Sequence, residues 1–267
     1  MISKKAKFKN TLQYTKTSYT KNMNFFNTII ELNKCNSTMS LADNASKFVT
    51  KPFVIRSDIQ TEGYGQYGRK WFSPEGGVWM TQVFDLNNPQ GLSTFMAIPI
   101  LRALKKYSNR VCVKWPNDVL LENKKIAGIL TEIKGNTAFV GIGVNVSNAV
   151  HEELKEIATS LENISNVKPL EFFQELIDFE EPLIKEFITS GFLPFRQEYE
   201  ENLIFMNKMV EVESKQRYLG KATGVSDIGE LILETNDNTV KISSGTVLNF
   251  YQLFKNNPKN IDFKKSL

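Results

Sequence analysis

The stretch Gln60-Thr61-Glu62-Gly63-Tyr64-Gly65-Gln66-Tyr67-Gly68-Arg69-Lys70-Trp71 is the most informative part of this chain. Its glycines allow backbone N–H groups to approach a ligand closely, because a glycine has no Cβ in the way. Arg69 adds a planar guanidinium that is always charged and suits phosphate. The stretch therefore predicts a loop that wraps an anionic small molecule.

The glycine spacing in this stretch also matches the dinucleotide-binding fingerprint G-x-G-x-x-G. That fingerprint has to open a helix inside a βαβ unit. Here residues 69–74 read Arg-Lys-Trp-Phe-Ser-Pro, which places a proline where the helix would be growing. A nicotinamide-binding loop is therefore disfavoured. An ordinary flexible surface loop would explain the glycines, but not Arg69 and Trp71 beside them.

Three further motifs follow along the chain. In Lys114-Trp115-Pro116-Asn117-Asp118 the proline fixes the backbone and Asn-Asp favours a tight turn, so a lysine and an aspartate flank a rigid bend. In Lys125-Ile126-Ala127-Gly128-Ile129-Leu130 a lysine enters a strand whose small residues leave room for a ligand. Gly141-Ile142-Gly143-Val144-Asn145 ends in an amide that can bond a polar ligand. Each motif alone would be interpreted as a solvated turn or a core strand.

Apolar runs and turn signals predict an α+β fold with a mostly antiparallel central sheet packed with helices. Strands are expected at 53–57, 77–86, 111–114 and 119–121, a hairpin at 125–133 and 137–146, and helices at 91–107, 169–188 and 193–203. Pro99 and Pro182 are expected to bend two of these helices or to shift their starts. Short strands at 210–212, 220–225, 230–235 and 239–242 predict a small SH3-like β-barrel.

These patterns divide the chain of 267 residues into a weakly ordered basic lead-in (1–24), a ligand-binding domain (25–204) and the small barrel domain (205–267). No apolar run approaches the length of a membrane span, and the first residues lack the apolar core of a secretory signal. Cys35 and Cys112 show no metal-type spacing, which favours a reducing, cytoplasmic compartment. The single histidine, His151, is expected at the surface. A net charge of +4 allows acidic partners but does not require nucleic acid.

The order of these elements resembles that of biotin protein ligases across residues 35–147. The elements are Ser37-Thr38, the glycine stretch followed by residues 73–77, and the three later motifs. The segment after 205 resembles the C-terminal domain of that family. The resemblance implies a fold like that of class II synthetases and biotin–lipoate ligases. It also implies an enzyme that joins biotin to ATP, with Mg²⁺, to form biotinyl-5′-AMP. The biotinyl group then passes to one lysine of the biotin carboxyl carrier domain of a biotin-dependent carboxylase.

The resemblance also implies roles for single residues. The implied contacts to biotin are Ser37, Thr38, Met39, Gln60, Tyr64, Gly65, Gln66, Lys125 and Gly128. The implied contacts to the adenylate are Gly63, Gly68, Arg69, Trp71, Lys114, Asn117, Gly143 and Asn145. Catalysis is assigned to Lys114, Asp118, Lys125 and Arg69. Displacing pyrophosphate needs positive charge and N–H donors rather than a protein nucleophile. Asp118 is expected to orient or deprotonate the acceptor lysine. No dedicated metal site is expected.

The sequence departs from the family at the glycine loop, which usually reads Gly-Arg-Gly-Arg-x-Gly-Arg. Tyr64 and Gln66 stand at the first two arginine positions, and only Arg69 remains. A neutral glutamine gives up the charge-assisted, bidentate contact of an arginine. Weaker retention of the acyl-adenylate is therefore expected, with leakage onto other lysines.

Several alternatives stay open at this point. A lipoate-type ligase shares the chemistry, but its arginine- and serine-flanked glycine loop is not found. The lost arginines also fit a non-catalytic biotin-binding relative. A biotin-sensing repressor would need an N-terminal DNA-binding domain, and the residues before the first motif are too few to build one. The expected type is therefore monofunctional, without sequence-specific DNA or membrane partners. A homodimer formed through exposed sheet edges is a further expectation from the family.

Overall fold

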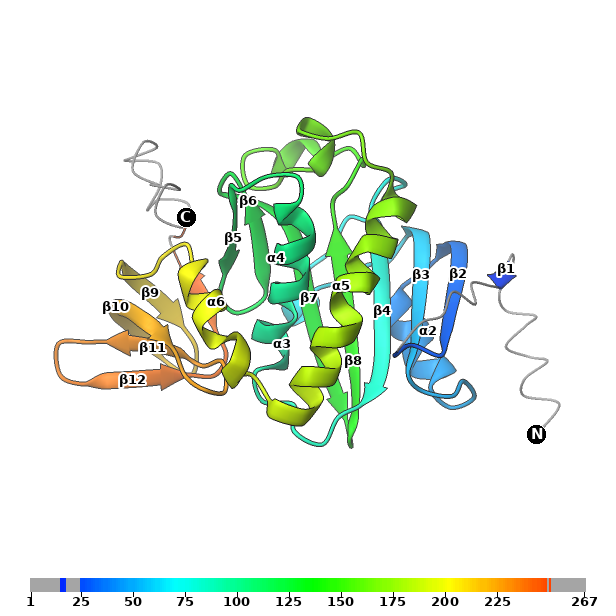
Figure 1. Ribbon diagram of the computed structural model, residues 1–267. Helices are drawn as coiled ribbons and strands as arrows, with labels where there is room; N and C mark the ends of the chain where they lie inside the picture. The colour runs from blue at the N-terminus through cyan, green and yellow to red at the C-terminus, as the bar shows by residue number, and fades with distance from the viewer. Residues whose placement is uncertain (1–14, 18–24, 249, 251–267) are drawn as a thin grey trace.

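The computed structural model describes residues 15–17, 25–248 and 250, and shows a large sheet covered by helices with a smaller sheet beside it (Figure 1). The large sheet has eight strands in the order β1-β2-β3-β4-β8-β7-β6-β5. Their bounds are β1 (Thr15–Thr17), β2 (Thr28–Cys35), β3 (Phe53–Gln60), β4 (Val78–Asp85), β5 (Val111–Lys114), β6 (Asp118–Leu121), β7 (Lys124–Lys134) and β8 (Thr137–Val144). Apart from Thr15–Thr17, the lead-in predicted for 1–24 lies outside the described residues.

All neighbouring strands in this sheet are antiparallel except β2 and β3, which are parallel. The predicted, mostly antiparallel sheet is thus confirmed, and the sheet is mixed. Strand β2 was not predicted. Its parallel pairing follows from α2 (Thr38–Ala45), which carries the chain back across the sheet before β3. The predicted hairpin is confirmed, because β7 and β8 pair up to Lys134 and Thr137 on either side of the turn.

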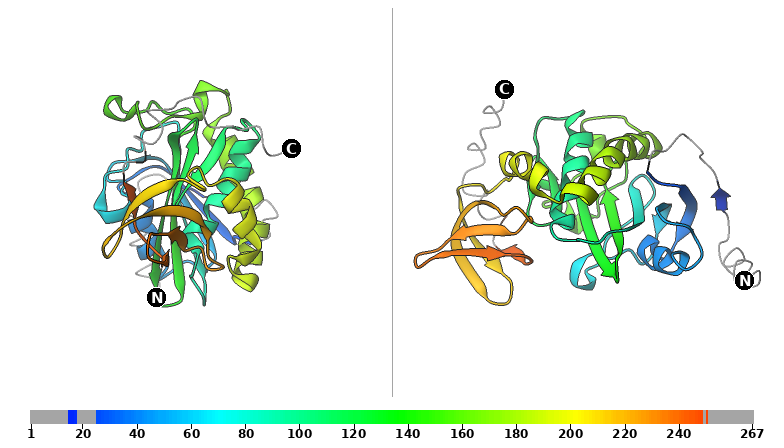
Figure 2. Two further views of the ribbon diagram at one scale, coloured as in Figure 1. Left: turned by 90° about the vertical axis from the view of Figure 1, so that its left-hand side faces the viewer. Right: turned by 60° about the horizontal axis from the view of Figure 1, so that its bottom comes forward.

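Helices cover both faces of the large sheet (Figures 1 and 2). On one face lie α4 (Ala97–Lys105) and α5 (Pro169–Ser190), and on the other lies α2. The helix predicted at 91–107 is divided into α3 (Leu92–Phe95) and α4, and Pro99 lies in the first turn of α4. The helix predicted at 193–203 is a 3₁₀ turn, η4 (Leu193–Phe195), followed by α6 (Arg196–Glu201). Pro182 lies inside α5, and the bend predicted there stays a prediction.

Strand alternation separates the packing side of the sheet from the ligand side. On β8, Val140 and Ile142 belong to the main core beneath α4 and α5. Gly141 faces α2 instead, where a Cβ on it would come within 3.0 Å of the Met39 sulfur. Because successive side chains of a strand point to opposite faces, Gly143 faces the same side as Gly141. The missing side chains leave the α2 face of the sheet hollow.

The C-terminal part forms a five-stranded antiparallel sheet in the order β12-β11-β10-β9-β13. Its strands are β9 (Met209–Glu213), β10 (Arg217–Val225), β11 (Leu231–Glu234), β12 (Thr239–Ile242) and β13 (Thr246–Leu248). The four predicted strands are all present. The predicted SH3-like domain is thus present as an antiparallel sheet, in which no pairing joins β12 to β13 within residues 205–248. Residues 251–267 of the predicted domain lie outside the described part of the chain.

Helix α5 buries two adjacent carboxyl groups that bind different partners. Glu181 Oε1 accepts the backbone N–H groups of Phe25 and Phe26, both at 3.1 Å. Glu180 is fully buried and accepts a short hydrogen bond from the side-chain amide of Gln82 on β4. Burial raises the pKa of Glu180 from 4.5 to about 8. Glu180 is therefore a neutral acid at pH 7 that ties α5 to the sheet.

This raised pKa predicts how the stability of the protein depends on pH. Above pH 4.5 the unfolded chain loses the Glu180 proton, whereas the folded chain keeps it up to about pH 8, so stability falls across this window. Glu180→Gln keeps a polar partner for Gln82 and removes the titration. We expect the variant to gain about 3 kcal/mol relative to the wild type at pH 7, and to lose this gain near pH 4.5. Urea unfolding at several pH values measures the difference, and a gain independent of pH would contradict the assignment.

Candidate functional site

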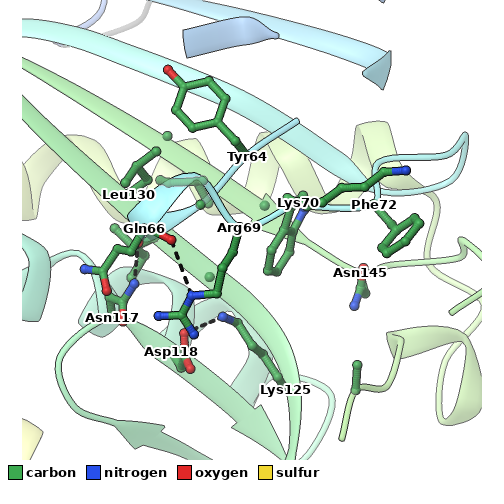
Figure 3. A pocket seen from close by; sticks show the side chains of 18 of the residues that line it. Tyr64, Gln66, Arg69, Lys70, Phe72, Asn117, Asp118, Lys125, Leu130 and Asn145 are labelled. Carbon is green, nitrogen blue, oxygen red and sulfur yellow. Dashed lines mark hydrogen bonds and ion pairs between the residues drawn. The ribbon is translucent and has the colours of Figure 1, made fainter. Parts of the chain in front are cut away.

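A cavity of about 310 Å³ lies on the hollow face of the sheet. It is bounded by the glycine loop, by strands β7 and β8, by the hairpin between β5 and β6, and by residues 148–158 (Figure 3). The cavity is lined by every site residue predicted from the sequence except Gly63 and Gly68. Gly63 and Gly68 belong to the backbone of the glycine loop and do not line the cavity.

The glycine loop is a small hairpin that folds over the cavity. The Gly65 N–H donates to the Arg69 carbonyl at 2.8 Å, and the Trp71 N–H donates to the Gly63 carbonyl at 2.9 Å. At the tip, Tyr67 and Gly68 have φ values of +58° and +68°. This left-handed backbone is open to glycine at no cost, which explains Gly68. Backbone hydrogen bonds within the loop therefore define its hairpin shape.

Trp71 closes the loop and lies flat against the sheet where two glycines make room for it. A Cβ on Gly143 would come within 2.5 Å of the indole nitrogen, and a Cβ on Gly128 within 3.0 Å of the ring. The Lys125 ammonium lies 5.0 Å from the centre of one Trp71 ring. The Trp71 Nε1 atom is buried and has no hydrogen-bond partner among the described residues. A buried donor of this kind is suited to a ligand acceptor.

Four charged side chains meet at one wall of the cavity: Lys114 and the three that Figure 3 labels, Arg69, Asp118 and Lys125. Asp118 Oδ1 lies 2.6 Å from the Lys125 nitrogen, and its Oδ2 lies 3.6 Å from the Lys114 nitrogen. Figure 3 shows Arg69 reaching from the loop toward Asp118 and Lys125. Burial lowers the pKa of Lys114; Asp118 opposes this effect, while Lys125 and Arg69 add to it. Three cations around one carboxylate leave an excess of positive charge, which favours an anionic ligand.

The opposite wall is polar but uncharged. Gln60 Oε1 accepts the Thr38 backbone N–H at 2.8 Å and the Thr38 hydroxyl at 3.0 Å, and its amide nitrogen donates to the Ser73 hydroxyl at 2.9 Å. The Thr81 hydroxyl donates to that of Thr38 at 2.8 Å. Ser37 caps the start of α2. This wall therefore presents amide and hydroxyl groups held in fixed orientations by one another.

Two asparagines predicted to contact the ligand also hold the backbone. Asn117 Nδ2 donates to the Ile129 carbonyl at 2.7 Å, and Asn145 Nδ2 donates to the Thr159 carbonyl at 3.0 Å. The side chains of Tyr64 and Gln66, which stand where arginines were expected from the resemblance, point in different directions. Figure 3 shows Gln66 beside Asn117, whereas Tyr64 points away, and its hydroxyl lies 3.5 Å from Glu132. A side chain at position 66 is therefore nearer to the charged wall than one at position 64.

Sequence reasoning missed some residues that line the cavity and others that support its walls from behind. His151 is exposed, as expected, but its ring also stacks on Phe72 at 4.3 Å and lines the cavity. Ser73 and Thr81 support Gln60 and Thr38, and only the closeness of Ser73 to the glycine loop signalled it. Residues 245–247 reach the cavity from the C-terminal sheet, and no local sequence signal places them there.

Two global findings accompany this geometry. Within residues 15–17, 25–248 and 250, no group of three or more His, Cys, Asp or Glu residues is arranged to hold a metal ion. In the same part of the chain, no helix is both long and apolar enough to cross a membrane.

Comparisons with known proteins agree with this arrangement. Residues 31–147 match the model of the biotin/lipoate A/B protein ligase family, and residues 205–248 match that of the biotin protein ligase C-terminal domain. The biotin–[acetyl-CoA-carboxylase] ligase of Paracoccus denitrificans is 31% identical over 196 residues, covering 65% of this chain and 80% of the relative. The biotin protein ligase of Aquifex aeolicus in complex with biotin and ATP superposes with a TM-score of 0.75 at 27% identity, covering 83% of this chain and 98% of that one.

Some relatives are longer proteins. The bifunctional ligase/repressor BirA of Bacillus subtilis is 31% identical over 211 residues, covering 73% of this chain but 65% of the relative. The chain thus spans just under two thirds of the length of this relative.

The contact between Gly143 and Trp71 predicts the effect of a single methyl group. Gly143→Ala should push the indole out of its place, because the new Cβ would lie 2.5 Å from the ring nitrogen. We expect a red shift of tryptophan emission that is absent when the same change is made in a Trp71→Phe background. Gly65→Ala is the matched control, since the nearest atom to its Cβ lies 3.9 Å away. An unchanged emission spectrum in Gly143→Ala would contradict the packing described here.

Proposed function

We propose that this chain, which belongs to the biotin protein ligase family, is an ATP-dependent ligase that biotinylates a carrier protein. In the first step a biotin carboxylate oxygen attacks the α-phosphorus of ATP, and pyrophosphate leaves. In the second step the ε-amine of a carrier lysine attacks the acyl carbon of biotinyl-5′-AMP, and AMP leaves while the amine loses a proton. The biotin carboxyl carrier domain of a biotin-dependent carboxylase is the proposed acceptor.

The observation that carries this proposal is the charged wall formed by Arg69, Lys114, Lys125 and Asp118 under the glycine loop. Negative charge develops on the phosphate oxygens as pyrophosphate departs. Cations fixed in a partly buried site stabilise that charge without reorganising, and no protein nucleophile is required. The three cations of this wall are the groups that the reaction needs.

The two other sides of the cavity suit the two halves of the acyl-adenylate. The amide and hydroxyl wall of Thr38 and Gln60 is proposed to face the polar ring of biotin, with the other biotin contacts predicted from the sequence around it. Trp71 and Asn145 are proposed to lie on the adenylate side. The unpaired indole N–H of Trp71 supports this placement, because a nucleotide offers acceptors for it.

Mg²⁺ is proposed to enter with ATP. Its preferred ligands are oxygens, and the phosphates supply them. Asp118 is the carboxylate closest to the proposed phosphate site, and it is already paired with Lys125 and Lys114. The donor set of this wall therefore fits an ion that is carried by the substrate. A homodimer and a cytoplasmic location stay predictions of the sequence.

The direct test is to supply the full chain with biotin, ATP and Mg²⁺ and to follow pyrophosphate release. We expect release that depends on biotin, and label transferred to a purified biotin carboxyl carrier domain. Repeating the assay with lipoate in place of biotin tests which of the two acids the chain activates. A chain that releases no pyrophosphate and shows no biotin binding in calorimetry would overturn the proposal. Binding without release would identify a non-catalytic relative.

Asp118 is proposed to take up the proton of the acceptor lysine, because general bases act through a carboxylate placed at the reacting amine. Asp118→Asn keeps the shape of the side chain and removes the base. We expect biotin transfer to fall about 100-fold, with adenylate formation reduced much less. Single-turnover assays that start from biotin and ATP, or from isolated biotinyl-5′-AMP, separate the steps. Asp43→Asn, which removes a carboxylate paired with the exposed Lys134, serves as the control. Equal loss in both steps would refute the role of base.

Gln66 is proposed to weaken the retention of biotinyl-5′-AMP. Gln66→Arg restores a cation beside the charged wall, and a charge-assisted contact is stronger than a neutral one. We expect the acyl-adenylate to dissociate about tenfold more slowly from the variant, with less labelling of bystander lysines. Gln66→Glu reverses the charge and should accelerate release. Release rates that do not follow the charge at this position would count against the idea.

A further inference from the structure

The hairpin that carries Lys114 and Asp118 is held from outside by the C-terminal part of the chain. The Val113 N–H donates to the Asn202 carbonyl at 2.9 Å, and the Ile204 N–H donates to the Val113 carbonyl at 3.1 Å. The indole N–H of Trp115 donates to the Gly229 carbonyl, between β10 and β11, at 3.0 Å. Val113 and Trp115, on either side of Lys114, are thus held by residues 202–204 after α6 and by Gly229 in the C-terminal sheet's β10–β11 connection.

One aromatic ring extends this contact to the lysine itself. The Lys114 ammonium lies 4.8 Å from the centre of the Phe250 ring. Phe250 follows β13, is 2% exposed and packs edge-on against Phe205 with ring centres 6.5 Å apart. Thr246 and Val247 of β13 line the same cavity. Phe250, just after the C-terminal sheet, therefore contacts the lysine of the charged wall although it does not line the cavity itself.

The nature of this contact suits a lysine that has to bind phosphate. The Lys114 side chain is 13% exposed, and its burial lowers the pKa of the ammonium. An aromatic face attracts a cation, and the attraction grows when water is excluded. A ring accepts no conventional hydrogen bond, so the contact with Phe250 itself occupies none of the N–H donors of the ammonium. Asp118 Oδ2 lies 3.6 Å from the same ammonium nitrogen.

We propose that Phe250 is a positioning residue that holds the Lys114 ammonium charged and directed into the cavity. The inference rests on the proposed function, because it assigns Lys114 to the phosphates of ATP.

The test is a double-mutant cycle between Phe250 and Lys114 in the full chain, with calorimetric affinity for a non-hydrolysable ATP analogue as the readout. Phe250→Leu keeps an apolar side chain and removes the aromatic face, so affinity should fall about five- to tenfold. Phe250→Tyr should restore most of it. In a Lys114→Met background, Phe250→Leu should have no further effect, because the cation that it contacts is gone. A loss of the same size in that background would overturn the proposal.

A second readout does not depend on catalysis. Phe250→Leu removes a contact that favours the charged amine and keeps the burial, so the pKa of Lys114 should fall. Acetylation of Lys114 followed by mass spectrometry over a pH series should then show faster labelling in Phe250→Leu than in Phe250→Tyr. Tyr218→Leu, which removes another aromatic ring from the C-terminal sheet, should leave labelling and analogue affinity unchanged.

These readouts separate the two proposals. If the wild type releases no pyrophosphate but Phe250→Leu still speeds the labelling of Lys114, the proposed function fails and the positioning role stands. If the wild type is active but Phe250→Leu and Phe250→Tyr agree in both affinity and labelling, the positioning role is wrong.

Discussion

One carboxylate between two lysines is the constraint around which this site is built. Asp118 pairs with Lys114 in the β5–β6 register and contacts Lys125 of β7, so all three side chains come from adjacent strands. Two ammonium groups brought this close would repel each other, and burial would further disfavour the charge on Lys114. The carboxylate opposes both effects, and the pKa of Lys114 still lies below its ordinary value because burial has the larger influence. The strand register therefore sets the position of the positive charge without any mobile element.

The second requirement is room, and the same strands supply it. Gly128 stands opposite Asp118 in the β6–β7 register, and Gly143 stands opposite Gly128 in the β7–β8 register. A row of small residues thus runs across the sheet next to the charged wall. Trp71 occupies part of this space and brings the glycine loop with it. The loop can lie over the cavity because the sheet beneath it lacks side chains at these positions.

Much of this arrangement can be predicted from local sequence. The β7–β8 hairpin follows from two apolar runs around Gly135, and the charged turn follows from Lys114 to Asp118. What local patterns miss depends on contacts between distant segments. The apolar residues of Thr28–Cys35 gave no strand prediction, and this strand is fixed by its parallel pairing with β3. Phe250 meets Lys114 only after the C-terminal sheet has docked, and the open edge between β12 and β13 is likewise a tertiary outcome.

The glycine loop has fewer cations than the family pattern, so the positive charge of the site lies mostly elsewhere. In the family pattern the glycine loop carries three arginines, whereas here it carries Arg69 alone. The two lysines of the wall remain, and they stand on strands of the large sheet; beside Lys114, Val113 bonds to residues 202–204 and Trp115 to Gly229. Cations on rigid strands need little ordering when a ligand binds, whereas a loop has to lose conformational freedom first. Under the proposed function, attraction to the phosphates would therefore rest mainly on Lys114 and Lys125, with Arg69 as the cation that the loop adds. The chemistry of adenylate formation would then depend mainly on the strands, and the residence time of the product on the loop.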